Sequence, residues 1–319
     1  MSEIKVILLC GSRMALPVMR DLFFFKQLAV VVIPEHCTEF IQEVELLLKD
    51  SGIPVLTVTK KDYAAKLQGA IKKYTPTLGL MVTFTYKLPA SVYNMPAKGF
   101  FNIHPGPLPA YRGPDPVFQQ IKNREEYAAV TIHKVDNDFD TGQVVLSDKI
   151  RLLVTDTHGI LTSKLAELAA RMVGVLIKMA GLDIAIPSRN QNNENVKYYK
   201  RQSAADITIN WATMDAETII ALANACNPWN KGVVTKLNNK IIRILEAEKI
   251  IAENNTDKAI APGNIIAIEE KGIIVSTIFN SRIRVIYVYT DEGFLPASRM
   301  RELGFSAGNV FQEIFNATN

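Results

Sequence analysis

Short apolar runs alternate with helix-length segments along the N-terminal part of this chain, and this alternation limits the fold more than any other feature. Two parallel strands must be joined by a long crossover, usually a helix, so strands separated by helices predict a doubly wound, mostly parallel α/β sheet. The runs are apolar almost throughout, as expected for strands that helices cover on both faces. The expected strands are residues 4–9, 28–33, 55–57 and 78–83, and the expected helices are residues 16–24, 41–49 and 63–74.

The pattern changes twice farther along the chain. The next expected elements are strands at residues 100–103, 129–134 and 143–150, in a more antiparallel section, and a long amphipathic helix at 157–179. Residues 187–195 are polar and rich in turn formers, which is typical of a linker. Beyond them, one helix at residues 216–225 precedes several short β runs, which predict a small antiparallel, OB-like β-barrel. We therefore expect a catalytic domain at residues 1–188, a linker at 189–209 and a β-barrel-like domain at 210–319.

Charge and composition narrow the class of protein. The formal net charge is +4, a mild excess that falls well short of a nucleic-acid-binding signature. The three cysteines, Cys10, Cys37 and Cys226, have no metal or redox spacing, which indicates reduced thiols. No apolar run is long enough to cross a membrane. We therefore expect a cytoplasmic protein that binds neither a metal nor a membrane.

The most unusual segment begins on an apolar strand at Phe100. Asn102 and His104 lie two residues apart on it, so both side chains point to the same face of the sheet. The strand then ends in a loop with five prolines and two glycines between positions 105 and 116, and such a stiff loop suits a preorganised site. Ligands of open α/β sheets bind at the carboxyl ends of the strands, where this strand ends. The residues alone leave a structural alternative open, in which His104 is buried against a neighbour and Asn102 turns the chain.

A second polar segment lies between two β runs and carries three carboxylates within five residues. Asp136, Asp138 and Asp140 are followed by Thr141 and Gly142. One of these carboxylates is suited to hold an imidazole in one tautomer and to raise its pKa. A solvated turn and a fragment of a calcium loop are the alternatives, although the further ligands and the terminal glutamate of a calcium loop are absent from the sequence.

Together these segments resemble the signature of the 10-formyltetrahydrofolate-dependent formyltransferases. The Asn-x-His pair at 102–104, the Leu-Pro-x-x-Arg-Gly loop at 108–113 and the Asp-x-Gly at 140–142 occur in the order and spacing of that family. The Ile-Asn-Trp at 209–211 and the Asn-Pro-Trp at 227–229 are similar to landmarks of its methionyl-tRNA formyltransferase branch, so the resemblance covers nearly the whole chain. It implies a Rossmann-like formyltransferase fold followed by an OB-like domain.

The resemblance also implies catalytic roles for three residues. Asn102 would hydrogen-bond the oxyanion formed when an amine attacks the formyl group, and such a donor is worth about 3–4 kcal/mol. His104 would move the proton or, as imidazolium, help to hold the oxyanion. Asp140 would orient His104 and support it electrostatically. None of these roles requires a metal.

The co-substrate implied by the resemblance is 10-formyltetrahydrofolate. Its pterin would lie against the backbone of the segment that follows the strand at 78–83, and the acidic loop would close the other side. For Lys87, contact with the glutamate tail of the folate and simple solvation are both open. The expected folate-binding residues are Phe84, Thr85, Tyr86, Lys87, Leu88, Asp136, Asn137, Asp138 and Phe139.

The acceptor amine is expected near the first strand and the proline-rich loop. The Gly11-Ser12 turn joins a strand to a helix N-terminus, a natural place for an anion, but it lacks the GxGxxG of dinucleotide-binding folds. The expected acceptor-binding residues are Gly11, Ser12, Arg13, Pro105, Gly106 and Arg112.

Departures from the family pattern bear on which amine is formylated. Methionyl-tRNA formyltransferases usually carry a basic, glycine-rich insertion after the second strand, whereas residues 33–40 are short and acidic, which weakens the phosphate contacts expected for tRNA. Residues 105–109 read Pro-Gly-Pro-Leu-Pro where Ser-Leu-Leu-Pro is common in the tRNA enzymes, and Asp138 stands where glycine is frequent. We therefore expect a small-molecule amine acceptor, such as an amino sugar nucleotide or a biosynthetic intermediate.

Other functions stay open from the residues alone. The whole-chain layout favours methionyl-tRNA formyltransferase, with tRNA as the acceptor. Hydrolysis of 10-formyltetrahydrofolate itself is a further alternative. A non-catalytic folate- or tRNA-binding protein is the alternative from another class, although all three catalytic positions are intact.

Overall fold

The computed structural model describes residues 3–250 and 260–314, and the chain divides into two compact units. The first unit consists of Met1–Pro116, Tyr127–Arg151 and Thr162–Tyr199, and the second of Val117–Glu126, Leu152–Leu161 and Lys200–Asn319. The sequence alone predicts domains that are continuous along the chain. The second unit instead also includes two segments from within the N-terminal half, and its long C-terminal part begins at Lys200.

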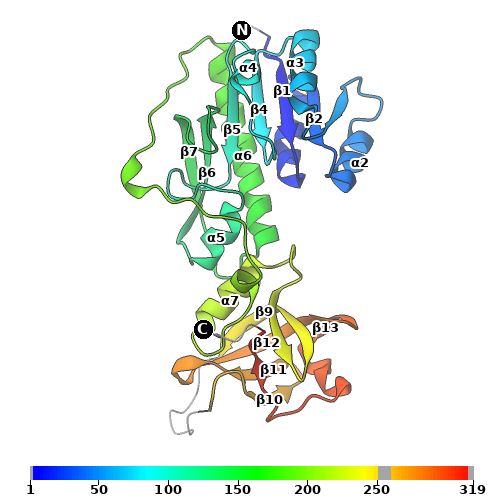
Figure 1. Ribbon diagram of the computed structural model, residues 1–319, viewed down its shortest axis with the longest axis vertical. Helices are drawn as coiled ribbons and strands as arrows, with labels where there is room; N and C mark the ends of the chain where they lie inside the picture. Colours follow the sequence, from blue (N-terminus) through cyan, green and yellow to red (C-terminus); the bar gives the residue numbers. More distant parts are fainter. Residues whose placement is uncertain (1–2, 251–259, 315–319) are drawn as a thin grey trace. The chain divides into compact units, whose positions relative to one another are not determined.

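The first unit contains a seven-stranded sheet in the order β3-β2-β1-β4-β5-β6-β7 (Figure 1). Its strands are β1 (Val6–Cys10), β2 (Leu28–Pro34), β3 (Val55–Val58), β4 (Leu78–Val82), β5 (Phe100–His104), β6 (Tyr127–Lys134) and β7 (Val144–Arg151). The pairings from β3 through β5 are parallel, and β6 and β7 join antiparallel at one edge. The predicted doubly wound, mostly parallel sheet is confirmed.

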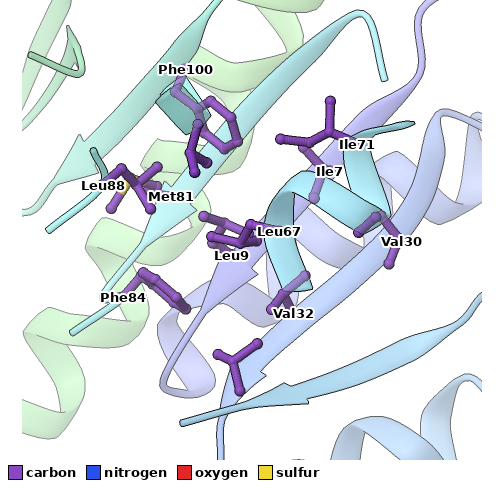
Figure 2. Close-up of a cluster of buried hydrophobic side chains, with 13 residues drawn as sticks. Ile7, Leu9, Val30, Val32, Leu67, Ile71, Met81, Phe84, Leu88 and Phe100 are labelled. Atoms are coloured by element: carbon purple, nitrogen blue, oxygen red, sulfur yellow. The ribbon is translucent and has the colours of Figure 1, made fainter. Parts of the chain in front are cut away.

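Helices connect the parallel strands, as the alternating pattern predicts. The helices of this part of the chain are α1 (Leu16–Phe24), α2 (Thr38–Leu47), α3 (Tyr63–Tyr74), α4 (Ala90–Tyr93), α5 (Pro116–Lys122) and α6 (His158–Gly181). Residues of α3 such as Leu67 and Ile71 pack on Ile7 and Leu9 of β1 in a buried apolar cluster (Figure 2). Each such side chain contributes roughly 1.5–3 kcal/mol by leaving water. This packing makes the carboxyl edge of the sheet a rigid platform for the polar residues that follow the strands.

Strand β5 lies at the point where the sheet changes from parallel to antiparallel pairing. Its register with β6 places Asn102 opposite His133 and His104 opposite Thr131. Directly opposite residues of an antiparallel pair project from the same face, with Cβ atoms about 5 Å apart. Four polar side chains therefore share one face at the end of β5.

The second unit is built around an antiparallel sheet in the order β10-β11-β12-β9-β8-β14, with β13 paired to β12. Its elements are α7 (Ala216–Ala225), β8 (Val233–Leu237), β9 (Lys240–Ile250), β10 (Ile265–Glu269), β11 (Gly272–Ser276), β12 (Arg282–Thr290), β13 (Gly293–Pro296) and β14 (Phe311–Gln312). The buried Trp211 donates its indole N–H to the Thr235 hydroxyl at 2.9 Å and stacks on Phe311 at 5.5 Å between ring centroids. The expected OB-like, barrel-like architecture is confirmed for this unit.

Among the helices of the described residues, none combines the length and the apolarity that crossing a membrane requires.

Candidate active site

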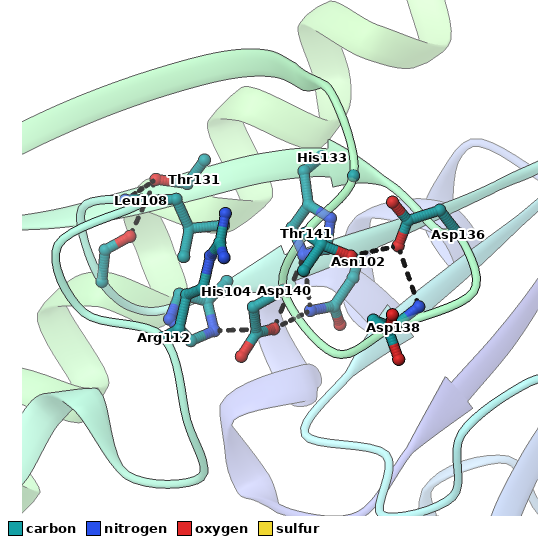
Figure 3. A network of polar contacts seen from close by, with 12 residues as sticks. Asn102, His104, Leu108, Arg112, Thr131, His133, Asp136, Asp138, Asp140 and Thr141 are labelled. Carbon is teal, nitrogen blue, oxygen red and sulfur yellow. Dashed lines mark hydrogen bonds and ion pairs between the residues drawn. The ribbon is translucent and has the colours of Figure 1, made fainter. Parts of the chain in front are cut away.

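Asp140 is the centre of the polar cluster at the end of β5 (Figure 3). Its Oδ1 atom lies 3.4 Å from His104 Nδ1 and 3.4 Å from Asn102 Nδ2. Its Oδ2 atom accepts a 3.0 Å hydrogen bond from the backbone N–H of Gly113. The structure thus brings together the three residues that the sequence predicts as catalytic, and it joins the proline-rich loop to the acidic loop through one carboxylate.

The two ring nitrogens of His104 face different partners. Nε2 lies 2.7 Å from the carbonyl oxygen of Tyr111, and a carbonyl only accepts, so Nε2 carries the hydrogen. Nδ1 is therefore the nitrogen that gains or loses a proton, and it faces Asp140. Burial lowers the pKa of His104, while Asp140 and the Tyr111 carbonyl act in the opposite direction and a second histidine, His133, lowers the pKa further. The ring is consequently neutral at pH 7, with Nδ1 free to accept a proton.

Asp140 is ionised and conformationally constrained. Burial alone would raise the pKa of Asp140, but the nearby rings of His104 and His133 and a hydrogen bond from the Gly113 N–H together hold the pKa below its ordinary range. Its backbone has φ of 59°, in the left-handed region. A non-glycine residue there costs on the order of 1 kcal/mol, so the surrounding contacts must hold it in place.

The sequence did not predict a role for His133, which the structure places in the same cluster. Its Nδ1 donates to the backbone carbonyl of Lys134 at 2.8 Å, so in the neutral ring Nε2 is an acceptor. Nε2 then accepts from the Asn102 amide at 3.0 Å and lies 3.7 Å from Asp140 Oδ1. The available signal was a histidine in the expected strand at 129–134, but the register of this strand against β5 had to be known to use it.

The loop after β5 is fixed against β6. The Thr131 hydroxyl donates to the Gly106 carbonyl at 2.7 Å and accepts from the Leu108 N–H at 3.3 Å. A Cβ on Gly106 would come within 2.8 Å of Pro116 and 3.2 Å of His104 Nε2, so only glycine fits. Pro105 and Gly106, predicted to bind the acceptor, are both buried, so they shape the loop that surrounds His104.

The two segments predicted to bind the folate lie beside one another. Lys87 forms an ion pair with Asp138 at 2.8 Å, and the Tyr93 hydroxyl donates to Asn137 at 2.8 Å. The side chains of Phe84 and Leu88 belong to the buried apolar cluster. At these two positions, only the backbone is therefore placed to contact a ligand. Thr85, Lys87, Asn137, Asp138 and Phe139 are exposed, and Tyr86 and Asp136 are partly buried. These segments flank a polar edge of the sheet, an arrangement that fits a pterin with its many ring donors and acceptors.

The cations predicted to bind the acceptor already have protein partners. Arg13 forms an ion pair with Glu43 at 2.7 Å, and the Ser12 hydroxyl lies 2.9 Å from the Thr83 hydroxyl. A Cβ on Gly11 would come within 2.6 Å of the Thr83 carbonyl, so glycine is needed where β1 and β4 end side by side. The guanidinium of Arg112 donates to the side-chain oxygen of Gln191. Within the described parts of the chain, no group of three or more His, Cys, Asp or Glu side chains is arranged to hold a metal ion.

Two family models match this chain. The model described as formyl transferase matches residues 29–176, and the model described as formyl transferase, C-terminal domain, matches residues 201–293. The methionyl-tRNA formyltransferase of Desulforamulus reducens is 31% identical over 234 residues, which cover 73% of this chain and 72% of that protein. That of Methylacidiphilum infernorum is 33% identical over 203 residues, 63% of this chain, and this match spans less than two thirds, 62%, of that protein's length.

A solved structure shows the same fold. The N-formyltransferase from Helicobacter canadensis, in complex with folinic acid and dTDP-3-aminofucose, superposes with a TM-score of 0.67 at 18% identity, covering 88% of this chain and 98% of that one. The two family models together define the class of protein: a formyltransferase followed by the C-terminal domain of that family. The chain belongs to the 10-formyltetrahydrofolate-dependent formyltransferase family. This membership confirms three predictions: the family, the folate-dependent class of enzyme, and formylated folate as the co-substrate.

Proposed function

We propose that this chain transfers a formyl group from 10-formyltetrahydrofolate to the primary amine of a small molecule, such as an amino sugar nucleotide or a biosynthetic intermediate. One observation carries the choice of a small acceptor. Strand β2 ends at Pro34 and α2 begins at Thr38, so only Glu35, His36 and Cys37 join them. The basic, glycine-rich insertion usual at this point in the tRNA-formylating enzymes has no counterpart here, and counterion release from tRNA phosphates would contribute less to binding.

In this proposal, Asn102 stabilises the oxygen that gains negative charge when the amine adds to the formyl carbon. One amide N–H is held by His133 at 3.0 Å, which fixes the plane of the amide group. The other reaches Asp140 at 3.4 Å, near the long limit for a hydrogen bond, so it is available to a better acceptor. A preorganised donor of this kind typically contributes about 3–4 kcal/mol to the transition state.

His104 accepts the proton that the amine loses and returns it to N10 of the folate as the bond from N10 to the formyl carbon breaks and tetrahydrofolate leaves. Nε2 is already committed to the Tyr111 carbonyl, so the proton is taken up at Nδ1, beside the Asp140 carboxylate. The ionised Asp140 stabilises the imidazolium that results. The lowered pKa of His104 keeps the ring neutral and ready as a base near pH 7.

A second candidate function is formylation of charged initiator tRNA. The curated relatives at 31% and 33% identity, both methionyl-tRNA formyltransferases, favour it. The C-terminal family-model match at residues 201–293 is compatible with either acceptor.

Release of tetrahydrofolate from 10-formyltetrahydrofolate separates these functions. The purified chain is supplied in turn with a panel of small amines, including amino sugar nucleotides, with charged initiator tRNA, and with no acceptor. We expect stimulation by a small amine. Stimulation by the tRNA alone would establish the second candidate, and equal turnover without any acceptor would establish folate hydrolysis instead.

A further inference from the structure

We propose that Gln191 is a positioning residue that holds Asp140 in its working orientation. Gln191 lies in the polar segment whose composition predicts a linker, 51 residues from Asp140. Because Asp140 acts on His104, this inference rests on the proposed function. It extends that function to a residue far from the catalytic loops in sequence.

The side-chain amide of Gln191 uses its full hydrogen-bonding capacity. Its Nε2 donates to the backbone carbonyls of Asp140 and Gly142, each at 2.8 Å. Its Oε1 accepts from Nε and Nη2 of Arg112, at 3.1 and 2.6 Å. Two donors and two acceptor sites is all that an amide side chain offers. All four bonds end on residues of the two loops that meet at the catalytic carboxylate.

These contacts close a ring around Asp140. Gly113, next to Arg112 in sequence, donates its N–H to the Asp140 carboxylate, while Gln191 joins Arg112 to the Asp140 carbonyl. The carboxylate and the backbone of Asp140 are thus anchored to the same short stretch of the proline-rich loop. This second anchor opposes the tendency of a non-glycine residue to leave the left-handed conformation that Asp140 adopts.

Gln191 is itself held by the segment around it. The backbone of Arg189 pairs with Val144 through two hydrogen bonds of 2.9 Å, so the segment lies along β7. Asn190 accepts a 2.9 Å hydrogen bond from the Gln143 side chain. Farther on, the Arg112 N–H donates to the Lys197 carbonyl at 3.0 Å. The segment is therefore a strap fixed at both ends, with Gln191 between its anchors.

The test measures the pKa of His104 directly, by NMR titration of the histidine ring protons, in Gln191→Met, Gln191→Asn and the unaltered chain. Methionine keeps the size and removes every hydrogen bond, and asparagine keeps the amide but is one carbon too short to reach both loops. Asn192→Ala is the matched control, because the exposed Asn192 side chain bonds, among the residues that the structure describes, only within its own segment, to Glu194. The His104 signal is assigned by its loss in His104→Gln.

The titratable groups acting on His104 are Asp140, which raises its pKa, and His133, which lowers it. When Gln191 no longer holds Asp140, the carboxylate draws away and the pKa of His104 falls, by at least about half a unit. We expect this fall in both Gln191 variants, with kcat down on the order of 10-fold or more and KM for the amine little changed. Asn192→Ala should show neither change.

A His104 pKa in both Gln191 variants equal to that of the Asn192→Ala control would overturn the proposal. Thermal unfolding curves check that each variant is folded. If the Gln191→Met variant does not fold, the His104 pKa in the Gln191→Asn variant decides the test. The titration needs neither acceptor nor turnover, so its result stands even if the chain proves to act on a different amine or on none.

Discussion

The loop after β5 and the loop between β6 and β7 meet at Asp140, but they are held in place by different means. The first carries five prolines between positions 105 and 116, so much of its conformation is fixed by the chain itself, and the Thr131 hydroxyl clasps it to β6. The second has no proline, exposes Asn137, Asp138 and Phe139, and is fixed by side-chain hydrogen bonds, including those of Gln191. Rigidity in the first is local, whereas in the second it is supplied from a distant segment.

The difference predicts how each loop fails when it is altered. Local stiffness survives the loss of a single contact, because each proline restricts the backbone independently. A loop held by a few tertiary hydrogen bonds loses its geometry when one of the partly buried ones is removed. Substitutions that disturb the second loop should therefore lower kcat by displacing Asp140. Substitutions at the end of β5 should lower kcat by removing a reacting group while the surrounding loop keeps its conformation.

His104→Ala should give the largest loss. His104 is the last residue of β5, and the loop after it is held by its own prolines and by Thr131, so removal of the side chain should leave the fold intact while kcat falls about 10³-fold, as for loss of a general base. His158→Ala, at the start of α6, is the control and should keep full activity. Tetrahydrofolate release and a thermal unfolding curve measure both effects. A His104→Ala variant with near-normal kcat would refute the role assigned to this ring.

Gly142→Ala should break the second loop through its backbone. An ideal Cβ on Gly142 would come within 1.7 Å of the Lys134 carbonyl, so the loop must shift and Asp140 with it. We expect a lower melting temperature and kcat reduced on the order of 10- to 100-fold. The control is Gly69→Ala in α3, where a Cβ meets nothing within 4 Å and the substitution should stabilise the helix by about 0.5–1 kcal/mol without affecting activity. Full activity in Gly142→Ala would show that the loop tolerates displacement.

The features of this chain that its sequence predicts are those determined by local patterns. Alternating apolar runs and helical segments predicted the parallel sheet, because strand burial and crossover length are both visible in a short window. The two-residue spacing of Asn102 and His104 placed them on one face for the same reason. Asp140 was singled out from its neighbouring carboxylates by the family resemblance, since nothing in the loop's own composition distinguishes it.

The remainder of the site depends on tertiary pairing. His133 contacts Asn102 because of the register between β5 and β6, and register is set by the packing of whole strands. Gln191 lies in a segment whose polar, turn-rich composition is that of a linker, yet Arg189 pairs with the edge of the sheet. Composition indicates only the conformation that a segment adopts in isolation. The strap has an ordered position because its neighbours hold it, and its composition does not reveal those tertiary contacts.

Asp138→Ala should have the smallest effect, because its ion pair with Lys87 is exposed on both sides, at 72% and 47% of the side-chain surface. Such pairs contribute at most about 1 kcal/mol, so KM for the folate should rise less than about 5-fold with kcat unchanged. Any such rise should shrink at high salt, where the pair in the unaltered chain is screened as well. Lys66→Ala, which removes a comparable exposed pair with Asp62, serves as the control for stability. If Asp138→Ala instead lowered kcat as strongly as Gly142→Ala, the position of the second loop would depend on its exposed tip, and not on its anchor at Gln191.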